Sequence, residues 1–442
     1  MDSPESDAAL NAGQDDLPRI QRRTVLTLAL AQLFSGVGNG AALAVGSLMA
    51  VQLSGRQELA GTSTMAISLA GALMALALAS VAASRGRRFA LATGLVLALA
   101  GTGLMVLAPV AESFPLVLAG SALIGAGTAA NLQARFAAVD LARPEHRGRD
   151  LSFVVWSITI GAVAGPNLIR PGAQLGMALG LPEISGPFLI SMAGLVIAIV
   201  LLVAGLRPDP LLHARRLQGE AAGERTTLPA RRRGSLRAGL AAVRQSPAAL
   251  VGLVTVAGAH LVMVAVMSMT PVHLQLMDQA SGQDHSSADT LAIIGFTISL
   301  HIAGMYALSP VFGMLTDRIG RPAMIVAGQV LLLTAAALAG LGHGNQALVA
   351  AGLVTLGLGW SASTIAGSTL LSESVSEVDR VLVQGVSDAC MGAAGAAGAA
   401  LSGVLLAIAG FAGLNAAAAV VAAAVLGIAL AGRRETAPSR GR

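Results

Sequence analysis

The sequence has little charge, few aromatic side chains, a single cysteine and no lysine. Charged residues make up 12% of its 442 residues, against about 25% in soluble proteins, which argues against a water-soluble domain. Cys390 has no second cysteine to pair with, so an internal disulfide is excluded. Aromatic side chains make up only 3%, too few for a platform on which nucleobases stack. The pI near 10.9 therefore does not predict a nucleic-acid partner, and membrane topology explains the arginines better.

Apolar runs of roughly 20 residues fill nearly the whole chain, and each can cross ~30 Å of hydrocarbon as a helix. The alternating pattern of barrel strands is absent. We expect no cleavable signal peptide, because the first apolar run follows a polar, acidic start and is too long for one. The sequence thus predicts an all-α polytopic membrane protein with twelve transmembrane helices, near residues 24–52, 61–83, 88–109, 114–135, 150–174, 186–206, 246–275, 289–315, 322–341, 346–371, 381–408 and 411–431.

A polar stretch at residues 207–245 divides these spans into two groups of six. It holds nine arginines and only three acidic residues, so we expect a cytoplasmic linker that lies partly on the anionic inner leaflet. The predicted parts are a cytoplasmic tail at 1–23, a six-helix bundle at 24–206, the linker at 207–245, a second six-helix bundle at 246–431 and a cytoplasmic tail at 432–442. Weak similarity between the bundles predicts two pseudo-symmetric halves.

The arginines also predict the orientation. With both termini in the cytoplasm, the tails and cytoplasmic loops hold 26 arginines, and the opposite side holds only Arg56 and Arg170. Positive residues concentrate on the cytoplasmic side of membrane proteins. We therefore expect a multi-pass protein of the cell (inner) membrane with both termini inside.

A loop with a characteristic spacing follows the eighth predicted span: Gly313-x-x-x-Asp317-Arg318-x-Gly320-Arg321. The glycine would permit a close helix contact, the aspartate would cap a neighbouring helix N-terminus, and the arginines would pair with acids such as Glu373 or Glu377. We interpret the loop as a latch at the cytoplasmic gate. It resembles the signature loop of the major facilitator superfamily, and with the twelve spans and the long central loop the resemblance covers nearly the whole chain. The resemblance implies a carrier in which two halves rock around a midplane site.

Two further segments have weaker parallels in that family. The first-half copy of the loop, residues 79–88, has Ala79 and Ala83 where the second half has glycine and aspartate, which leaves a symmetrical latch open. The motif Gly161-x-x-x-Gly165-Pro166 in the fifth span resembles the family's glycine–proline motif, which is frequent in exporters. A small-residue packing face with a proline kink explains it equally well.

Methionine and histidine recur at helical spacing in the seventh and eighth spans. Met263 and Met267 are four residues apart, as are His301 and Met305, and this spacing stacks two side chains on one helix face. Thioether and imidazole ligands suit a soft ion, above all Cu(I). The two pairs resemble the motifs of the CcoA-like copper importers. Methionine at this spacing is otherwise core filler, and that alternative stays open.

The position of the four residues in the membrane favours a transport site. All lie within about 9 Å of their span centres, at 1.5 Å per residue, and carrier sites lie near the midplane. His260 and His273 on the seventh span are further candidate ligands. Asp388, about 12 Å into the eleventh span, is a candidate proton or gate site, with helix pairing as the alternative.

Taken together, these patterns predict a monomeric secondary transporter in contact with membrane lipid, with no enzymatic activity and no bound cofactor. Copper uptake, with Cu(I) as the transported substrate, is the first hypothesis. A carrier of a small organic solute, for vitamin uptake or drug efflux, is the second, although so few aromatic residues argue against large planar drugs. A membrane sensor or assembly factor that binds metal without moving it is the third.

Overall fold

The computed structural model describes residues 17–143, 147–222, 236–281 and 287–436, and within these residues it contains helices and no strand. The long helices are α2 (Leu17–Ser54), α3 (Thr62–Arg85), α4 (Arg87–Val110), α5 (Phe114–Ala137), α6 (Arg147–Asn167), α8 (Gly186–Gly205), α11 (Pro247–Ser281), α12 (Ser287–Tyr306), α14 (Arg321–Leu341), α15 (Gln346–Glu373) and α16 (Glu377–Thr436). The shorter ones are η1 (Gln57–Leu59), α7 (Ile169–Ala178), η3 (Glu183–Ser185), α9 (Pro210–Ala222), α10 (Leu236–Arg244) and α13 (Ser309–Ile319).

These helices lie where the sequence predicts the twelve spans, and the all-α membrane fold is confirmed. Nine helical stretches of the described residues are long and apolar enough to cross a membrane, and shorter apolar pieces occur at Val45–Ser54 and Trp156–Gly165. Many large apolar side chains point outward, among them Leu341 at 88% and Ile408 at 80% exposure. Lipid, rather than water, is the solvent in which such a surface is stable.

Four of the predicted spans have an unexpected shape. The fifth is broken at Leu168, after Pro166, into α6 and α7, and the eighth is broken between Tyr306 and Ser309 into α12 and α13. The eleventh and twelfth are joined as α16 across the non-helical Gly410. Proline lacks the N–H that a helix interior needs, which explains the first break.

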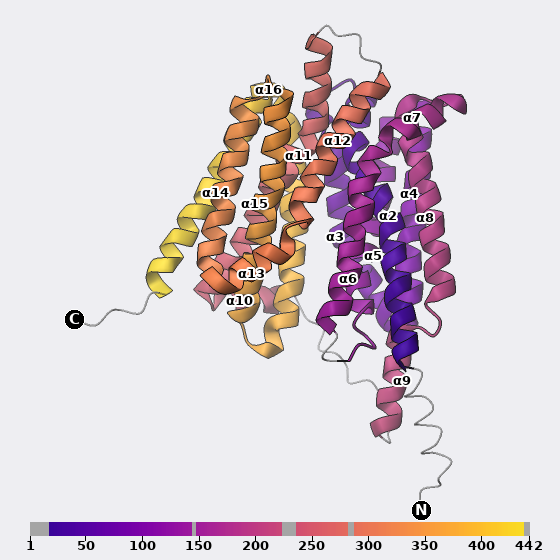
Figure 1. Ribbon diagram of the computed structural model, residues 1–442, viewed down its shortest axis with the longest axis vertical. Coiled ribbons are helices and arrows are strands. Elements are labelled where there is room, and N and C mark those ends of the chain that lie inside the picture. The colour runs from indigo at the N-terminus through magenta and orange to yellow at the C-terminus, as the bar shows by residue number, and fades with distance from the viewer. Residues whose placement is uncertain (1–16, 144–146, 223–235, 282–286, 437–442) are drawn as a thin grey trace, which may run out of the picture.

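The helices form two bundles that stand side by side (Figure 1). The first contains α2 to α8 and the second α11 to α16, as the pseudo-symmetric halves of the sequence predict. Between them, α10 packs on the second half through the fully buried Val243. The predicted linker is therefore helical at both ends, while residues 223–235 lie outside the described part of the chain.

The two halves meet most closely on the predicted outer side, at the top of Figure 1. A side-chain carbon on Gly61 would collide with the carbonyl oxygen of Ala399, and one on Gly403 would come within 2.5 Å of that of Glu58. Lower down, the Asn167 amide donates to the Ser299 hydroxyl at 2.7 Å. Backbone thus packs directly on backbone, and the outer side is closed.

The inner side is joined differently. Arg135 at the end of α5 donates to Asp388 on α16 at 2.9 Å, and their side chains are 30% and 45% exposed. A partly solvated ion pair of this kind contributes less than backbone packing. The halves are therefore held together more firmly outside than inside.

Each half has a similar ion pair at a loop on the predicted cytoplasmic side. Arg87, the first residue of α4, donates to Asp140 at 2.8 and 3.3 Å. Arg321, the first residue of α14, donates to Glu373 at 3.0 and 2.8 Å. The first half thus has a counterpart of this pairing although Ala79 and Ala83 replace the signature glycine and aspartate.

Candidate functional site

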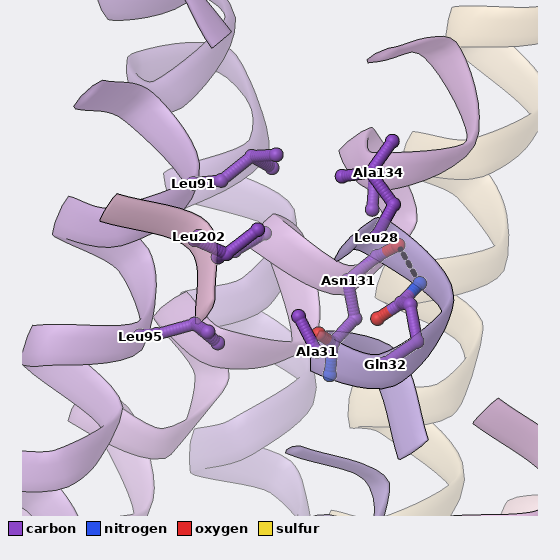
Figure 2. A pocket seen from close by; sticks show the side chains of 9 residues that line it. Leu28, Ala31, Gln32, Leu91, Leu95, Asn131, Ala134 and Leu202 are labelled. Atoms are coloured by element: carbon purple, nitrogen blue, oxygen red, sulfur yellow. Dashed lines mark hydrogen bonds between the residues drawn. The ribbon is translucent and has the colours of Figure 1, made fainter. Parts of the chain in front are cut away.

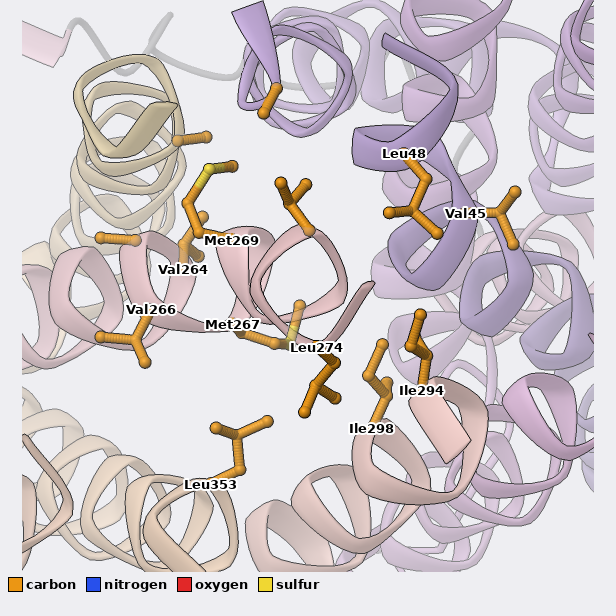
Figure 3. Close-up of a cluster of buried hydrophobic side chains, with 14 of the residues drawn as sticks. Val45, Leu48, Val264, Val266, Met267, Met269, Leu274, Ile294, Ile298 and Leu353 are labelled. Atoms are coloured by element: carbon orange, nitrogen blue, oxygen red, sulfur yellow. The ribbon is translucent and has the colours of Figure 1, made fainter. Parts of the chain in front are cut away.

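The four predicted copper ligands are buried in one apolar region of the second half. Met263, Met267 and Met305 are 3%, 5% and 7% exposed and belong to the same hydrophobic cluster, and His301 is fully buried. Figure 3 shows Met267 of α11 within that cluster, together with Ile298 of α12 and Leu353 of α15. The methionines therefore pack as core side chains in this conformation.

His301 turns toward α15. Its Nδ1 lies 2.7 Å from the Leu353 carbonyl oxygen, so Nδ1 carries the proton and donates it. Its Nε2 is sealed from the surroundings and has no hydrogen-bond partner among the described residues. A buried acceptor without a partner is costly, and this nitrogen is available as a ligand beside the methionine sulfurs of the predicted metal site.

The other histidines of the seventh span have different surroundings. His273 bonds the His343 carbonyl oxygen at 2.8 Å through Nε2 and stacks on Phe411 with ring centroids 4.0 Å apart. These contacts join α11 to the turn that contains His343 and to Phe411 of α16. They hold His273 away from the other candidate ligands. Among the described residues, no three His, Cys, Asp or Glu side chains gather as a metal site.

His260 instead belongs to an aromatic cluster that sequence reasoning missed. The Trp360 indole N–H donates to His260 Nδ1 at 3.1 Å, with ring centroids 6.1 Å apart. Tyr306, the only tyrosine of the chain, meets Trp360 edge-on at 6.0 Å. We call His260, Tyr306 and Trp360 the ring cluster. Its members come from α11, α12 and α15 and are partly buried.

The ring cluster lies near the middle of the membrane. Trp360 is central in α15, His260 is within four residues of the centre of α11, and Tyr306 stands at the break between α12 and α13. Broken helices near the midplane are where carriers bind their substrates. The central position of the tryptophan and tyrosine in their spans was the signal available in the sequence.

The first half contains a small cavity between α2, α4, α5 and α8 (Figure 2). It is lined by leucine and alanine side chains and by two amides, Gln32 and Asn131. Gln32 donates to the Asn131 carbonyl oxygen at 2.8 Å, and the Ser35 hydroxyl donates to the Asn131 side chain at 2.9 Å. Both amides therefore already have partners within the protein, and this cavity is a weaker site candidate than the ring cluster.

The predicted gating residues are distributed over the inner side. A side chain on Gly313 would meet nothing within 4 Å, so the close helix contact expected for it is not made in this conformation. Asp317 is 74% exposed and faces Arg321 at 3.2 Å rather than a helix N-terminus. Arg318 is exposed, and Gly320, the residue just before α14, has a positive φ of 86°.

The glycine–proline motif of the fifth span lies where α6 packs on α2. A side-chain carbon on Gly161 would collide with the Leu33 carbonyl oxygen. Gly165 is buried, and α6 ends at Asn167, just after Pro166. The contact between α6 and α2 requires a residue without a side chain at position 161. This requirement supports the interpretation of the motif as a packing face.

Two six-helix bundles closed on one side, with a polar and aromatic cluster near the midplane, define a membrane carrier. The chain belongs to the Major Facilitator Superfamily, whose family pattern matches residues 28–288 and 283–442. It is therefore a transporter and not an enzyme.

Two Bacillus subtilis (strain 168) relatives are 34% identical to the chain. The uncharacterized MFS-type transporter YdeG matches over 88% of this chain and 86% of its own length, and so does YddS. The riboflavin transporter RfnT of Brucella anthropi is 24% identical over 89% of this chain and 92% of its own length. Among solved structures, the nucleoside transporter NupG has a TM-score of 0.68 at 16% identity, covering 94% of this chain and 100% of that one. That last likeness shows the fold alone.

Proposed function

We propose that this protein carries a small organic solute across the cell membrane by alternating access of its two halves. The observation that carries the proposal is the ring cluster near the midplane, where aromatic faces and polar atoms lie together. Organic solutes bind through apolar and aromatic surface with a few placed polar groups. One relative, which matches this chain over 92% of its own length, is named as a riboflavin transporter. Riboflavin is an organic solute, so this relative favours the same class of substrate.

The charge pattern of the spans supports an uncharged or weakly charged solute. Residues 247–277, 290–316 and 346–372 contain no Asp, Glu, Lys or Arg. A charged substrate at the membrane centre needs an opposite charge nearby. Here the spans that hold the ring cluster supply none.

The contacts between the halves support alternating access. The outer side is closed by glycine-mediated backbone packing, and the inner side is bridged by the Arg135–Asp388 pair. Rocking that exchanges these contacts would expose the centre to each side in turn. In this scheme Asp388 is a gate residue.

Uptake into liposomes tests the proposal. The purified protein, reconstituted in vesicles, is offered radiolabelled riboflavin, labelled glucose or Cu(I), with protein-free vesicles as the control. We expect saturable accumulation of an organic solute and none of copper. Accumulation of copper alone would overturn the proposal.

Copper is the second candidate, favoured by the unpartnered Nε2 of His301 in a region that also holds Met263, Met267 and Met305. Neutral thioether and imidazole ligands would leave the ion's charge uncompensated at the membrane centre, which weakens this candidate.

If copper is the transported substrate, Met263→Leu and His301→Leu abolish its uptake, whereas Met267→Leu and Met305→Leu reduce it. If the methionines are core filler, the methionine variants keep full solute transport, since leucine conserves the volume. A metal sensor would bind copper without any uptake.

A further inference from the structure

The hydrogen bond inside the ring cluster fixes where the His260 proton lies. Because the Trp360 indole N–H donates to Nδ1, Nδ1 is the acceptor and the neutral imidazole carries its proton on Nε2. No described residue accepts that proton. Nε2 is also absent from the sealed polar atoms of the described residues, so it is a donor that is not fully enclosed.

The Tyr306 hydroxyl is in the same situation. It has no hydrogen-bond partner among the described residues and is not sealed from the surroundings. Each of the two rings that Trp360 contacts therefore carries a polar group without a partner among the described residues. Two such groups near the midplane are available to a ligand.

Glycines on α16 allow this helix to approach the cluster closely. A side-chain carbon on Gly395 would lie 3.1 Å from His260 Nε2, and one on Gly392 would lie 3.1 Å from Ala72 of the first half. Gly392 and Gly395 are one helical turn apart. The free donor of His260 thus lies next to the interface of the two halves, where alternating access opens and closes.

We propose that the ring cluster binds a planar, uncharged heteroaromatic ring, which stacks on Trp360 and accepts hydrogen bonds from His260 Nε2–H and the Tyr306 hydroxyl. This inference rests on the proposed function and names its substrate class. Ring nitrogens and carbonyl oxygens supply acceptors in the plane of such a molecule, and stacking on an aromatic side chain tolerates many ring types. The three spans that supply the ring cluster carry no charged residue between 247 and 277, 290 and 316, and 346 and 372, so the cluster offers no counter-charge to a charged ring.

The chain offers a direct readout, because it has only two tryptophans, Trp156 and Trp360. Trp156 is 53% exposed on α6, remote from the cluster in the sequence and in the other half. In a Trp156→Phe variant, Trp360 is the sole indole emitter. We expect adenine and riboflavin to quench its fluorescence saturably, and ribitol, the non-aromatic part of riboflavin, to leave it unchanged. The Trp360→Phe variant, which keeps Trp156, controls for quenching without binding.

Binding of radiolabelled riboflavin by equilibrium dialysis then tests each group. Tyr306→Phe removes one hydroxyl and should raise Kd about three- to tenfold. His260→Leu should have a similar effect, while His260→Gln, which can accept from Trp360 and still donate, should restore most of the affinity. Trp360→Leu should weaken binding about tenfold or more.

The outcomes separate this inference from the proposed function. Transport of glucose with no binding or quenching by either planar probe overturns the inference and leaves the proposed function standing. Binding of planar probes that Tyr306→Phe, His260→Leu and Trp360→Leu do not change also overturns it. Transport of copper alone overturns both.

Discussion

At the residue scale, Gly410 shows how one position shapes the second half. The backbone there has φ 67° and ψ −175° within the otherwise helical α16. Only glycine adopts this region without strain. The turn it makes separates the eleventh span from the twelfth, so a single residue replaces a loop.

We predict that Gly410→Ala destabilises the protein by about 1–3 kcal/mol, the usual cost of forcing a side chain into this conformation. A new methyl group would meet no neighbour within 4 Å, so the effect would be conformational and not steric. The apparent thermal midpoint in detergent should fall. Gly427→Ala is the matched control, since it lies on the same helix with open space and no positive φ. An equal effect of both substitutions would contradict the explanation.

At the scale of the elements, the two loop ion pairs differ in exposure. The Arg87 and Asp140 side chains are 16% and 12% exposed, whereas those of Arg321 and Glu373 are 27% and 51% exposed. Solvent screens the second pair more than the first. The two halves therefore keep the same pairing with different strength.

We predict that Asp140→Asn lowers the thermal midpoint more than Glu373→Gln does, with a loss of about 1–3 kcal/mol for Asp140. The exposed Asp317 is the control on the signature loop, and Asp317→Asn should leave stability unchanged while slowing transport if the latch hypothesis holds. The charge swap Arg87→Asp with Asp140→Arg should recover part of the loss. Equal losses of stability in Asp140→Asn and Glu373→Gln would show that burial does not determine how much each ion pair stabilises the protein.

At the scale of the whole molecule, the contacts between the halves decide which side is open. Gly61 has ordinary helical backbone angles, with φ −77° and ψ −9°, so its substitution brings no backbone strain. Its close contact with Ala399 exists only when the outer side is closed. Any side chain there should favour the outward-open state.

We therefore predict that Gly61→Val separates the outer ends of the halves. The measurement is the distance between spin labels at Arg56→Cys and Leu341→Cys in a Cys390→Ser background, which the single cysteine of the chain makes possible. We expect a longer mean distance than in the parent and no change with Gly103→Val, which has nothing within 4 Å. Arg135→Ala should leave the outer distance short, since it loosens only the inner side. An unchanged distance in Gly61→Val would show that this contact is not the outer gate.

Topology is a second prediction at this scale. With 26 arginines on one side and two on the other, reporter fusions after residues 23, 225 and 435 should all report cytoplasm. The predicted domain boundaries 1–23, 24–206, 207–245, 246–431 and 432–442 require that result. A periplasmic signal at 225 would contradict the arrangement of two halves around a cytoplasmic linker.

The sequence by itself determined the membrane class, the spans, the two halves and the family. These follow from the length and composition of apolar runs, because hydrocarbon imposes a helix of about 20 residues on any chain that crosses it. The signature loop adds a local motif that can be recognised from the spacing of its residues in the sequence. None of this needed knowledge of which helices touch.

The candidate site was decided by tertiary structure. Sequence reasoning grouped Met263, Met267, His301 and Met305 by helical spacing, but spacing places residues on one helix face without saying which neighbour that face meets. Sequence reasoning also gave Trp360 and Tyr306 no role, because it considered only the low aromatic content of the whole chain. Packing of α11, α12 and α15 brings Trp360 to His260 across 100 residues of chain and Tyr306 to Trp360. Contacts between distant segments depend on how helices pack, and no local pattern encodes them.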